Sequence, residues 1–428
     1  MTKPKQVGLW PLIASTFFMV SGGAYGLEEL VACGYGVAIA AILVTPLVWS
    51  VPTALMVGEL ASALPREGGY YAWVRRALGP FWGFQEAWLS LVASVFDMAI
   101  YPTLFTLYLG RVAPPLSGTA SAVTVGVAII AASAAWNLRG AATVGAGSVG
   151  LGVVVSAPFV VLTVASLAHA RGAPAAAPEA PQAALSAGLV VAMWNYMGWD
   201  NVSTIAEEVA RPERTYPIAV LATVGLVTLS YLLPVCSAGV AGVDPSGWTT
   251  GAWVTAARLT GGDWLAWAVV LGATVCGVGM FNALLLSYSR LPAVLAEDGY
   301  LPSFLARRDP RGGAPQASIV ACALMYAACL SLGFRRLVEL DILLYGASLV
   351  LEFVALVALR VREPGLPRPF KVPGGAAFAA MLGVGPALLL GVALWRCEHE
   401  RVGPVSSLTL GALLVALGPV LYAARRAR

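Results

Sequence analysis

The sequence predicts an all-α membrane protein with twelve transmembrane helices. Charged residues make up only 11% of the 428 residues, and hydrophobic residues make up 59%. Soluble domains carry about 25% charged residues, so these charges are too few to cover a soluble surface. Apolar runs long enough to cross a bilayer, which takes ~20 residues, recur along the whole chain. We therefore expect lipid to surround most of the protein, with no room for a soluble catalytic domain.

The expected spans follow one another with short connections rich in Pro, Gly and polar residues. They cover residues 8–32, 36–62, 80–109, 119–136, 143–168, 183–208, 215–241, 262–290, 316–333, 337–360, 378–396 and 404–424. The first apolar stretch is too long for a signal peptide, and no small-residue cleavage site follows it. We interpret it as a retained helix, so that residues 1–428 form a single transmembrane domain.

The positive charges predict the orientation of these spans. An inner N-terminus places most of the 26 Lys and Arg residues in inner loops and tails, as the positive-inside rule requires. We expect a multi-pass protein of the cell (inner or plasma) membrane with both termini cytoplasmic. The net charge of +4 follows from this distribution and does not indicate nucleic-acid binding.

Two of the expected spans contain polar, glycine-containing interruptions. Residues 21–26 interrupt the first span, and residues 195–201 interrupt the sixth. Inverted-repeat transporters have discontinuous helices at matching positions of their two halves and bind substrate there. The pattern predicts a five-plus-five inverted repeat, with residues 8–168 and 183–360 as its halves and the last two helices, 378–424, outside it. Kinked helices without a ligand are the alternative interpretation.

Several motifs resemble the amino acid–polyamine–organocation superfamily of transporters. They are Gly58–Ala61, Pro65–Val74, Gly79–Phe84, Glu207–Pro217 and Asp298–Pro302. A narrower resemblance is to the plant polyamine-uptake and L-type amino-acid transporter branch, through Ser21–Glu29, Trp49–Pro52, Gly83–Trp88, Asp97 with Tyr101 and Pro102, Leu343–Phe353 and Arg368–Pro373. The resemblance implies a twelve-helix inverted-repeat fold and, often, proton-coupled uptake.

One segment departs from the plant branch. That branch has carboxylates in helix 8 shortly after a Gly-Met-Phe motif. Here Gly279–Phe281 is followed by Asn282, Leu284 and Tyr288. The missing acidic residues argue against a fully polyamine-like site and leave a zwitterionic amino acid as a candidate substrate.

The interruptions and their aromatic neighbours supply the candidate substrate-binding residues. Free N–H groups at Gly22 and Gly23 would suit a substrate carboxylate if a helix restarts there. Free carbonyls around residues 194–197 and nearby aromatic rings would suit an ammonium group. The candidate substrate-binding residues are Ser21, Gly22, Gly23, Tyr25, Asp97, Tyr101, Trp194, Asn195, Tyr196, Gly198, Trp199 and Phe281. Close helix packing is the alternative role for the glycines.

Four carboxylates are candidates for ion coupling or gating. Asp97 lies deep in the third span, where an ionisable residue indicates a functional site. It is either the counter-ion of a substrate ammonium or the carrier of a coupling proton, with a structural hydrogen bond as the alternative. Of Glu28 and Glu29, only one can face the bundle, and we favour Glu28. Glu207 and Glu208 are expected to form a cytoplasmic ion-pair cluster with Arg211 and Arg214 that closes the inner gate.

These observations predict a secondary active transporter that imports amino acids or polyamines by alternating access, coupled to protons. An ion-independent amino-acid exchanger is the alternative. An intramembrane enzyme is disfavoured because no nucleophile–base pair is evident, so no catalytic residue is predicted, and a nutrient sensor would need soluble signalling regions. The two His and six Cys residues show no metal-binding spacing, so neither a metal nor a cofactor is expected. The expected partners are the small-molecule substrate, a proton and the lipid bilayer.

Overall fold

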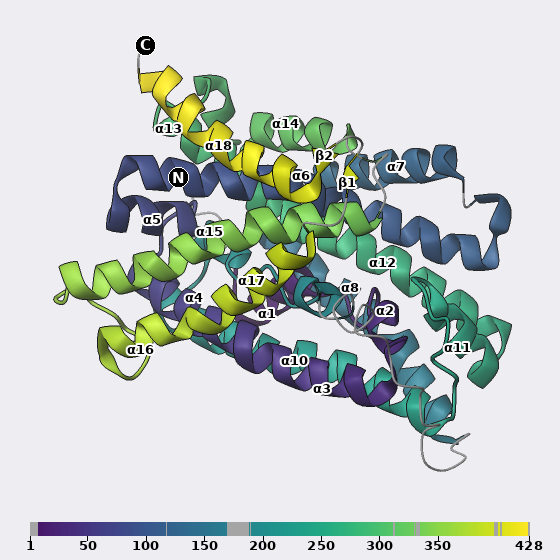
Figure 1. Ribbon diagram of the computed structural model, residues 1–428. Helices are drawn as coiled ribbons and strands as arrows, with labels where there is room; N and C mark the ends of the chain where they lie inside the picture. The colour runs from purple at the N-terminus through teal and green to yellow at the C-terminus, as the bar shows by residue number, and fades with distance from the viewer. Residues whose placement is uncertain are drawn as a thin grey trace.

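The computed structural model describes residues 7–116, 118–168, 188, 190–310, 313–328, 330, 334–397, 401–402 and 405–426. Within these ranges the chain is almost entirely helical (Figure 1). The exception is a small antiparallel hairpin of β1 (Arg401–Val402) and β2 (Val405–Ser406). The prediction of an all-α protein is therefore confirmed for the described part of the chain.

Eight of the described helices are long and apolar enough to cross a membrane. They are the continuous helix of α3 (Tyr35–Thr45), η1 (Pro46–Ser50) and α4 (Val51–Ala63), then α6 (Pro80–Val112), α8 (Ala141–Ala168), α10 (Pro212–Val240), α12 (Asp263–Tyr288) continued by α13 (Arg290–Glu297), α15 (Phe334–Arg362), α16 (Gly375–Leu382) continued by α17 (Val384–Cys397), and α18 (Ser407–Arg426).

Three shorter apolar helices fall on the predicted spans that remain. They are α1 (Leu9–Val20), α7 (Thr119–Asn137) and α14 (Gln316–Ala327). The predicted span 183–208 is helical over 190–194, and residues 181–187 lie outside the described ranges. The total of twelve spans and the inverted repeat thus stay predictions, while the multi-helix membrane architecture is observed.

Several short elements were not predicted. They are α2 (Glu28–Val31), α5 (Tyr70–Leu78), η2 (Pro114–Leu116), η3 (Asn201–Glu208), α11 (Ala252–Gly261) and η4 (Ser303–Ala306). In Figure 1, α5 and α16 lie at one end of the long helices and α11 lies at the opposite end. These two ends are called the α5 end and the α11 end below.

Two long helices, α6 and α15, form the centre of the structure. They pack against each other, and α6 also packs against α12. The interrupted first helix, α1, packs against α8, α10 and α12. By contrast, α17 and α18 expose most of their apolar side chains, as expected for helices that face lipid. The site described next therefore lies where α1, α6, α12 and α15 meet the second interruption.

Candidate functional site

The first interruption extends from Ser21 to Leu27. Ser21 has extended backbone angles and ends α1, and helical structure resumes only at Glu28. Gly23 and Gly26 have φ angles of 95° and 88°, a region in which glycine is strongly favoured over other residues. A Cβ on Gly22 would lie 1.9 Å from Sγ of Cys276. The glycines therefore let an unwound backbone pass close to α12.

The second interruption lies between the helical residues 190–194 and η3. Gly198 has a φ angle of 94°, and a Cβ there would lie 2.3 Å from the carbonyl oxygen of Met19. The second interruption thus contacts the end of α1, and the Asn195 side chain donates to the Gly26 carbonyl of the first interruption at 3.5 Å. The Gly198 N–H donates to the Tyr345 hydroxyl at 3.0 Å, and the Asn195 carbonyl accepts from the Tyr231 hydroxyl at 2.6 Å. Side chains of other helices satisfy these unwound backbone groups, as membrane depth requires.

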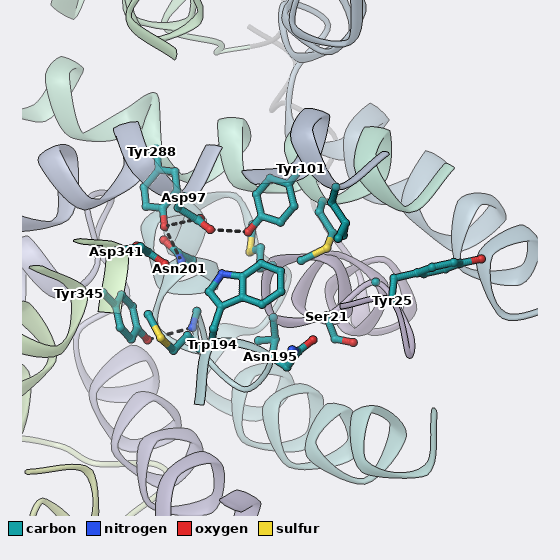
Figure 2. A pocket seen from close by; sticks show the side chains of 17 residues that line it. Ser21, Tyr25, Asp97, Tyr101, Trp194, Asn195, Asn201, Tyr288, Asp341 and Tyr345 are labelled. Atoms are coloured by element: carbon teal, nitrogen blue, oxygen red, sulfur yellow. Dashed lines mark hydrogen bonds between the residues drawn. The ribbon is translucent and has the colours of Figure 1, made fainter. Parts of the chain in front are cut away.

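A closed pocket lies between the two interruptions (Figure 2). The space free at its centre is about 20 Å³, roughly what one water molecule needs. A substrate would therefore require the surrounding helices to move apart. The pocket is lined by Met19, Val20, Ser21, Gly22, Tyr25, Asp97, Tyr101, Leu104, Trp194, Asn195, Met197, Gly198, Asn201, Met280, Tyr288, Asp341 and Tyr345.

Asp97 on α6 is the centre of a hydrogen-bond network in this pocket. Its side chain accepts from the Tyr101 hydroxyl at 2.6 Å and from the Tyr288 hydroxyl at 3.2 Å, and Asn201 donates to Tyr288 at 3.3 Å. Figure 2 shows both tyrosines turned toward the carboxyl group. The indole ring of Trp194 stacks on Tyr101 with ring centroids 6.4 Å apart. A carboxylate flanked by aromatic rings is suited to an ammonium ligand.

A second carboxyl group, Asp341 on α15, lies in the same pocket. It is only 3% exposed and lies close enough to Asp97 for their charges to interact. No Lys, Arg or His is among the described residues that line the pocket. Two buried carboxyl groups without a protein cation repel each other when both are charged. A ligand with more than one positive charge would relieve that repulsion.

The structure divides the predicted substrate-binding residues into two groups. Those that line the pocket are Ser21, Gly22, Tyr25, Asp97, Tyr101, Trp194, Asn195 and Gly198. Those that do not are Gly23, Tyr196, Trp199 and Phe281, and each of these packs elsewhere. Phe281 forms an edge contact with Tyr326, and its neighbour Met280 takes the place in the pocket.

The reasons for the other exclusions are similarly local. The missing Cβ of Gly23 points toward Phe159, 3.7 Å away, on α8. Tyr196 points its hydroxyl at the Ile42 carbonyl, 2.9 Å away. The indole N–H of Trp199 donates back to the carbonyl of Tyr196 at 2.8 Å. Tyr196 and Trp199 thus brace the second interruption, and Gly23 packs against α8, instead of facing the ligand space.

The expected helix restart at Gly22 and Gly23 is wrong. The Gly23 N–H donates to the Ser21 hydroxyl at 3.1 Å, and regular helix resumes only at Glu28. The Gly23 N–H is thus already occupied, and a carboxylate site at these glycines stays a prediction. The reason for the missing restart is the positive φ of Gly23, which turns the chain out of the helical path.

Sequence reasoning missed Asp341, Tyr288, Tyr345, Asn201 and Met280, which all line the pocket. Asp341 carried a usable signal, because an acidic residue inside an apolar run indicates a functional site. It stands near the expected start of the 337–360 span. In the structure α15 begins seven residues before it, at Phe334.

Glu28 lies between the pocket and the α11 end. It is fully buried, whereas Glu29 is partly exposed. One oxygen of Glu28 accepts from the Tyr108 hydroxyl on α6 and from the Gly251 N–H, 2.9 Å away, just before α11. Nearby, Trp253 on α11 donates to the Ala24 carbonyl at 2.8 Å. These contacts tie α11 to the first interruption and close the pocket on this side.

Glu207 and Glu208 lie on the other side of the pocket, in contact with different partners from those expected. Glu208 pairs with Arg290 of α13, with Nε 3.1 Å from Oε1, and not with Arg211 or Arg214, which are exposed in the described structure. Glu207 accepts from the backbone N–H of Glu67 at 3.2 Å. The correction arises because Arg211 has a left-handed backbone, with φ of 48°, where the chain turns away into α10.

Comparison with known proteins gives a consistent result over nearly the full chain. The amino acid permease family model matches residues 13–405. The polyamine transporter PUT1 of Oryza sativa subsp. japonica is 38% identical over 424 residues, covering 99% of this chain and 78% of the relative. The polyamine transporter RMV1 of Arabidopsis thaliana is 34% identical, covering 96% of this chain and 84% of the relative. An uncharacterised transporter of Mycobacterium tuberculosis is 27% identical, covering 98% and 89%.

Proposed function

Because the chain belongs to the amino acid permease family of membrane transporters, we propose that it carries polyamines by alternating access, with Asp97 and Asp341 as counter-ions of the substrate ammonium groups. The observation that carries this proposal is the pair of buried carboxyl groups in a pocket whose described lining has no cation. The two polyamine transporters that resemble this chain support the same substrate class.

An amino acid fits the pocket less well than a polyamine does. Its carboxylate would need hydrogen-bond donors or a cation in place of the Gly23 N–H, which the Ser21 hydroxyl already occupies. It would also face Asp97 and Asp341, and like charges at one buried site are unfavourable. Neutral or basic amino acids remain the second candidate substrates, because the family model is that of amino acid permeases.

The proposed cycle begins from the closed pocket and opens it to one end at a time. The contacts of Glu28 keep the pocket closed toward the α11 end, and the ion pair of Glu208 with Arg290 keeps it closed toward the α5 end. In the proposed orientation the α5 end is cytoplasmic, so that substrate enters at the α11 end. We propose proton-coupled import, with Asp97 and Glu28 as candidate coupling residues and Glu207 and Glu208 as gating residues. Ion-independent exchange of substrates is the alternative transport mode.

A thermal-shift screen of the purified protein tests the substrate class. Spermidine, spermine and putrescine should raise the melting temperature, because a ligand that binds only the folded state stabilises it. Leucine and glutamate should have little effect at the same concentrations. A shift with leucine and none with any polyamine would overturn the proposed substrate class.

The counter-ion role predicts the effect of two substitutions. Asp97→Asn and Asp341→Asn each keep the side-chain size but remove one charge from a desolvated site. Losing one charge-assisted contact of about 2 kcal/mol or more should weaken spermidine binding at least about tenfold. Isothermal titration calorimetry would measure it. Asp263→Asn is the matched control, because Asp263 forms an exposed pair with Arg258 and its loss should leave spermidine affinity unchanged.

A further inference from the structure

The two central helices repeat one pattern of carboxyl groups. Eleven residues separate Glu86 from Asp97 on α6, and eleven separate Asp341 from Glu352 on α15. That spacing is about three helical turns, so each pair shares a face and is about 16 Å apart along its axis. α6 and α15 pack against each other in opposite directions. One acid of each helix therefore lies at the pocket, and the other lies closer to the α5 end.

A third carboxyl group lies between the acids at the pocket and the acids closer to the α5 end. Asp200, from the second interruption, accepts a hydrogen bond from the Tyr345 hydroxyl, and Tyr345 lines the pocket. Glu352 follows Tyr345 by seven positions, two helical turns along α15 toward the α5 end, and its charge would interact with those of Asp200 and Glu86. We call Glu86, Asp200 and Glu352 the carboxyl triad.

The triad is buried and incompletely paired. Glu86 and Glu352 are 0% exposed and Asp200 is 1% exposed. Oε2 of Glu86 and both side-chain oxygens of Glu352 accept no hydrogen bond within the described structure. A buried carboxyl group whose oxygens accept no hydrogen bond is favoured in its neutral, protonated form.

The surroundings of the triad supply hydroxyl groups and no positive charge. Within the described chain, the groups that interact with it are Ser90, Tyr70, Tyr345, Asp341 and the backbone at Asn201. An isolated charge costs far more in such an environment than a neutral carboxyl group. Protons are the cations small enough to satisfy acids at this depth without further ligands.

From this geometry we infer that the carboxyl triad of Glu86, Asp200 and Glu352 is a proton-binding site that connects the substrate pocket with the α5 end. The inference rests on the proposed transport function and places the coupling proton on the triad instead of on Asp97 or Glu28. A proton leaves the Asp341 carboxyl and reaches Asp200 either directly or through Tyr345, whose hydroxyl accepts one proton as it gives up its own. It then passes to Glu352 and Glu86, so only O–H bonds break and form.

This assignment separates substrate binding from proton binding. A cationic substrate at Asp97 and Asp341 favours their charged forms, which displaces a proton toward the triad. The triad then holds that proton until the α5 end opens. Tyr70 of α5 borders the triad on that side, so the exit route passes beside the first turn of α5.

Liposomes that contain the purified protein test the inference with spermidine as the probe. In the parent protein, an imposed pH gradient should drive spermidine accumulation, with proton movement followed by a pH-sensitive dye. Glu352→Gln and Glu86→Gln should each abolish gradient-driven accumulation and the dye signal, while spermidine binding and spermidine–spermidine counterflow persist. Glu339→Gln is the control, because Glu339 is a buried acid of the same helix whose oxygen lies 3.4 Å from Ser407, away from the triad.

The outcomes separate the coupling site from the proposed function. Failure of the parent protein to bind or exchange any polyamine would refute the proposed function itself. Normal polyamine exchange with pH-driven accumulation retained in both triad variants, or accumulation driven by sodium instead of protons, would refute the triad assignment alone. Infrared difference spectra give a readout that does not depend on transport: the band of protonated carboxyl groups should shrink in Glu352→Gln and not in Glu339→Gln. An unchanged band in Glu352→Gln would also refute it.

Discussion

At the scale of single residues, a motif can owe its presence to packing alone. Glu59 of the Gly58–Ala61 motif is fully buried. It binds Arg360 through Nε at 2.9 Å and Arg368 at 3.2 Å, and it accepts the Val372 N–H at 2.8 Å. Two motifs that resemble the transporter superfamily, 58–61 and 368–373, thus meet at one ion cluster. Its distance in sequence and its separate partners place it outside the pocket, so its role is structural.

We therefore predict that Glu59→Gln destabilises the protein strongly. The substitution leaves two buried arginines without their carboxylate, and breaking such a pair costs about 3–5 kcal/mol. The melting temperature in detergent should fall, which differential scanning fluorimetry would measure. Glu363→Gln removes a partner of Arg76 at the surface, where an ion pair contributes only about 0–1 kcal/mol. Equal melting temperatures for the two variants would contradict this role.

At the scale of elements, the contact between the two interruptions is the decisive feature. The Gly198 backbone lies against the Met19 carbonyl at the end of α1, so neither interruption can move independently of the other at this point. Each interruption alone is explained by its glycines and polar residues. Their contact explains why α1 and residues 190–201 form one wall of the pocket.

Gly198→Ala should disrupt this wall. The methyl group would lie 2.3 Å from the Met19 oxygen, and the φ angle of 94° is unfavourable for alanine. We expect a loss of stability above about 1 kcal/mol, which such a backbone conflict exceeds, together with loss of spermidine binding. Gly242→Ala is the matched control, because Gly242 also has a positive φ, 72°, but open space around it. If both variants bind spermidine like the parent protein, the contact is unimportant.

At the scale of the whole molecule, ion pairs close the α5 end. Arg290 lies between Glu208 and Glu67, and Arg308 contacts Glu67 at 2.6 Å and Glu297 at 2.8 Å. These five side chains, with Arg290 only 1% exposed, connect η3, α13, the segment before α5 and the segment after η4. Opening toward this end must separate them.

The closure of the α5 end should depend on pH through Glu67. Burial raises the pKa of Glu67 above the ordinary value of a glutamate, although Arg290 and Arg308 partly offset the shift. A pKa that is raised in the closed arrangement means that this arrangement binds a proton more tightly than an open one in which Glu67 is exposed, so acidification through that pKa favours closure. Hydrogen exchange in η3 should therefore slow on mild acidification, after correction for the intrinsic exchange rate.

Variants separate Glu67 from the other acids of this network. Glu67→Gln should lose the slowing of η3 exchange on mild acidification, because the titrating carboxyl group is absent. Glu297→Gln, which removes only the more exposed partner of Arg308, should keep the pH dependence of the parent protein. The same pH dependence in Glu67→Gln as in the parent protein would assign the effect to another group.

The sequence by itself determined the membrane class, most helix positions and the two interruptions. These features depend on composition, on the length of hydrophobic segments and on local backbone preferences, and all three can be read from the amino-acid sequence. The sequence also identified Asp97, because a carboxylate inside an apolar segment can be recognised without knowing how the helices pack.

Only the tertiary structure decided which residues face one another. It placed Asp341 in the same pocket as Asp97 and turned Gly23 and Phe281 away from that pocket. It also paired Glu208 with Arg290. Asp200 came to lie between Glu86 and Glu352. Each of these outcomes depends on the rotation and crossing of helices that are far apart in sequence. Local patterns carry no information about that rotation, because it is set by the packing of the whole bundle.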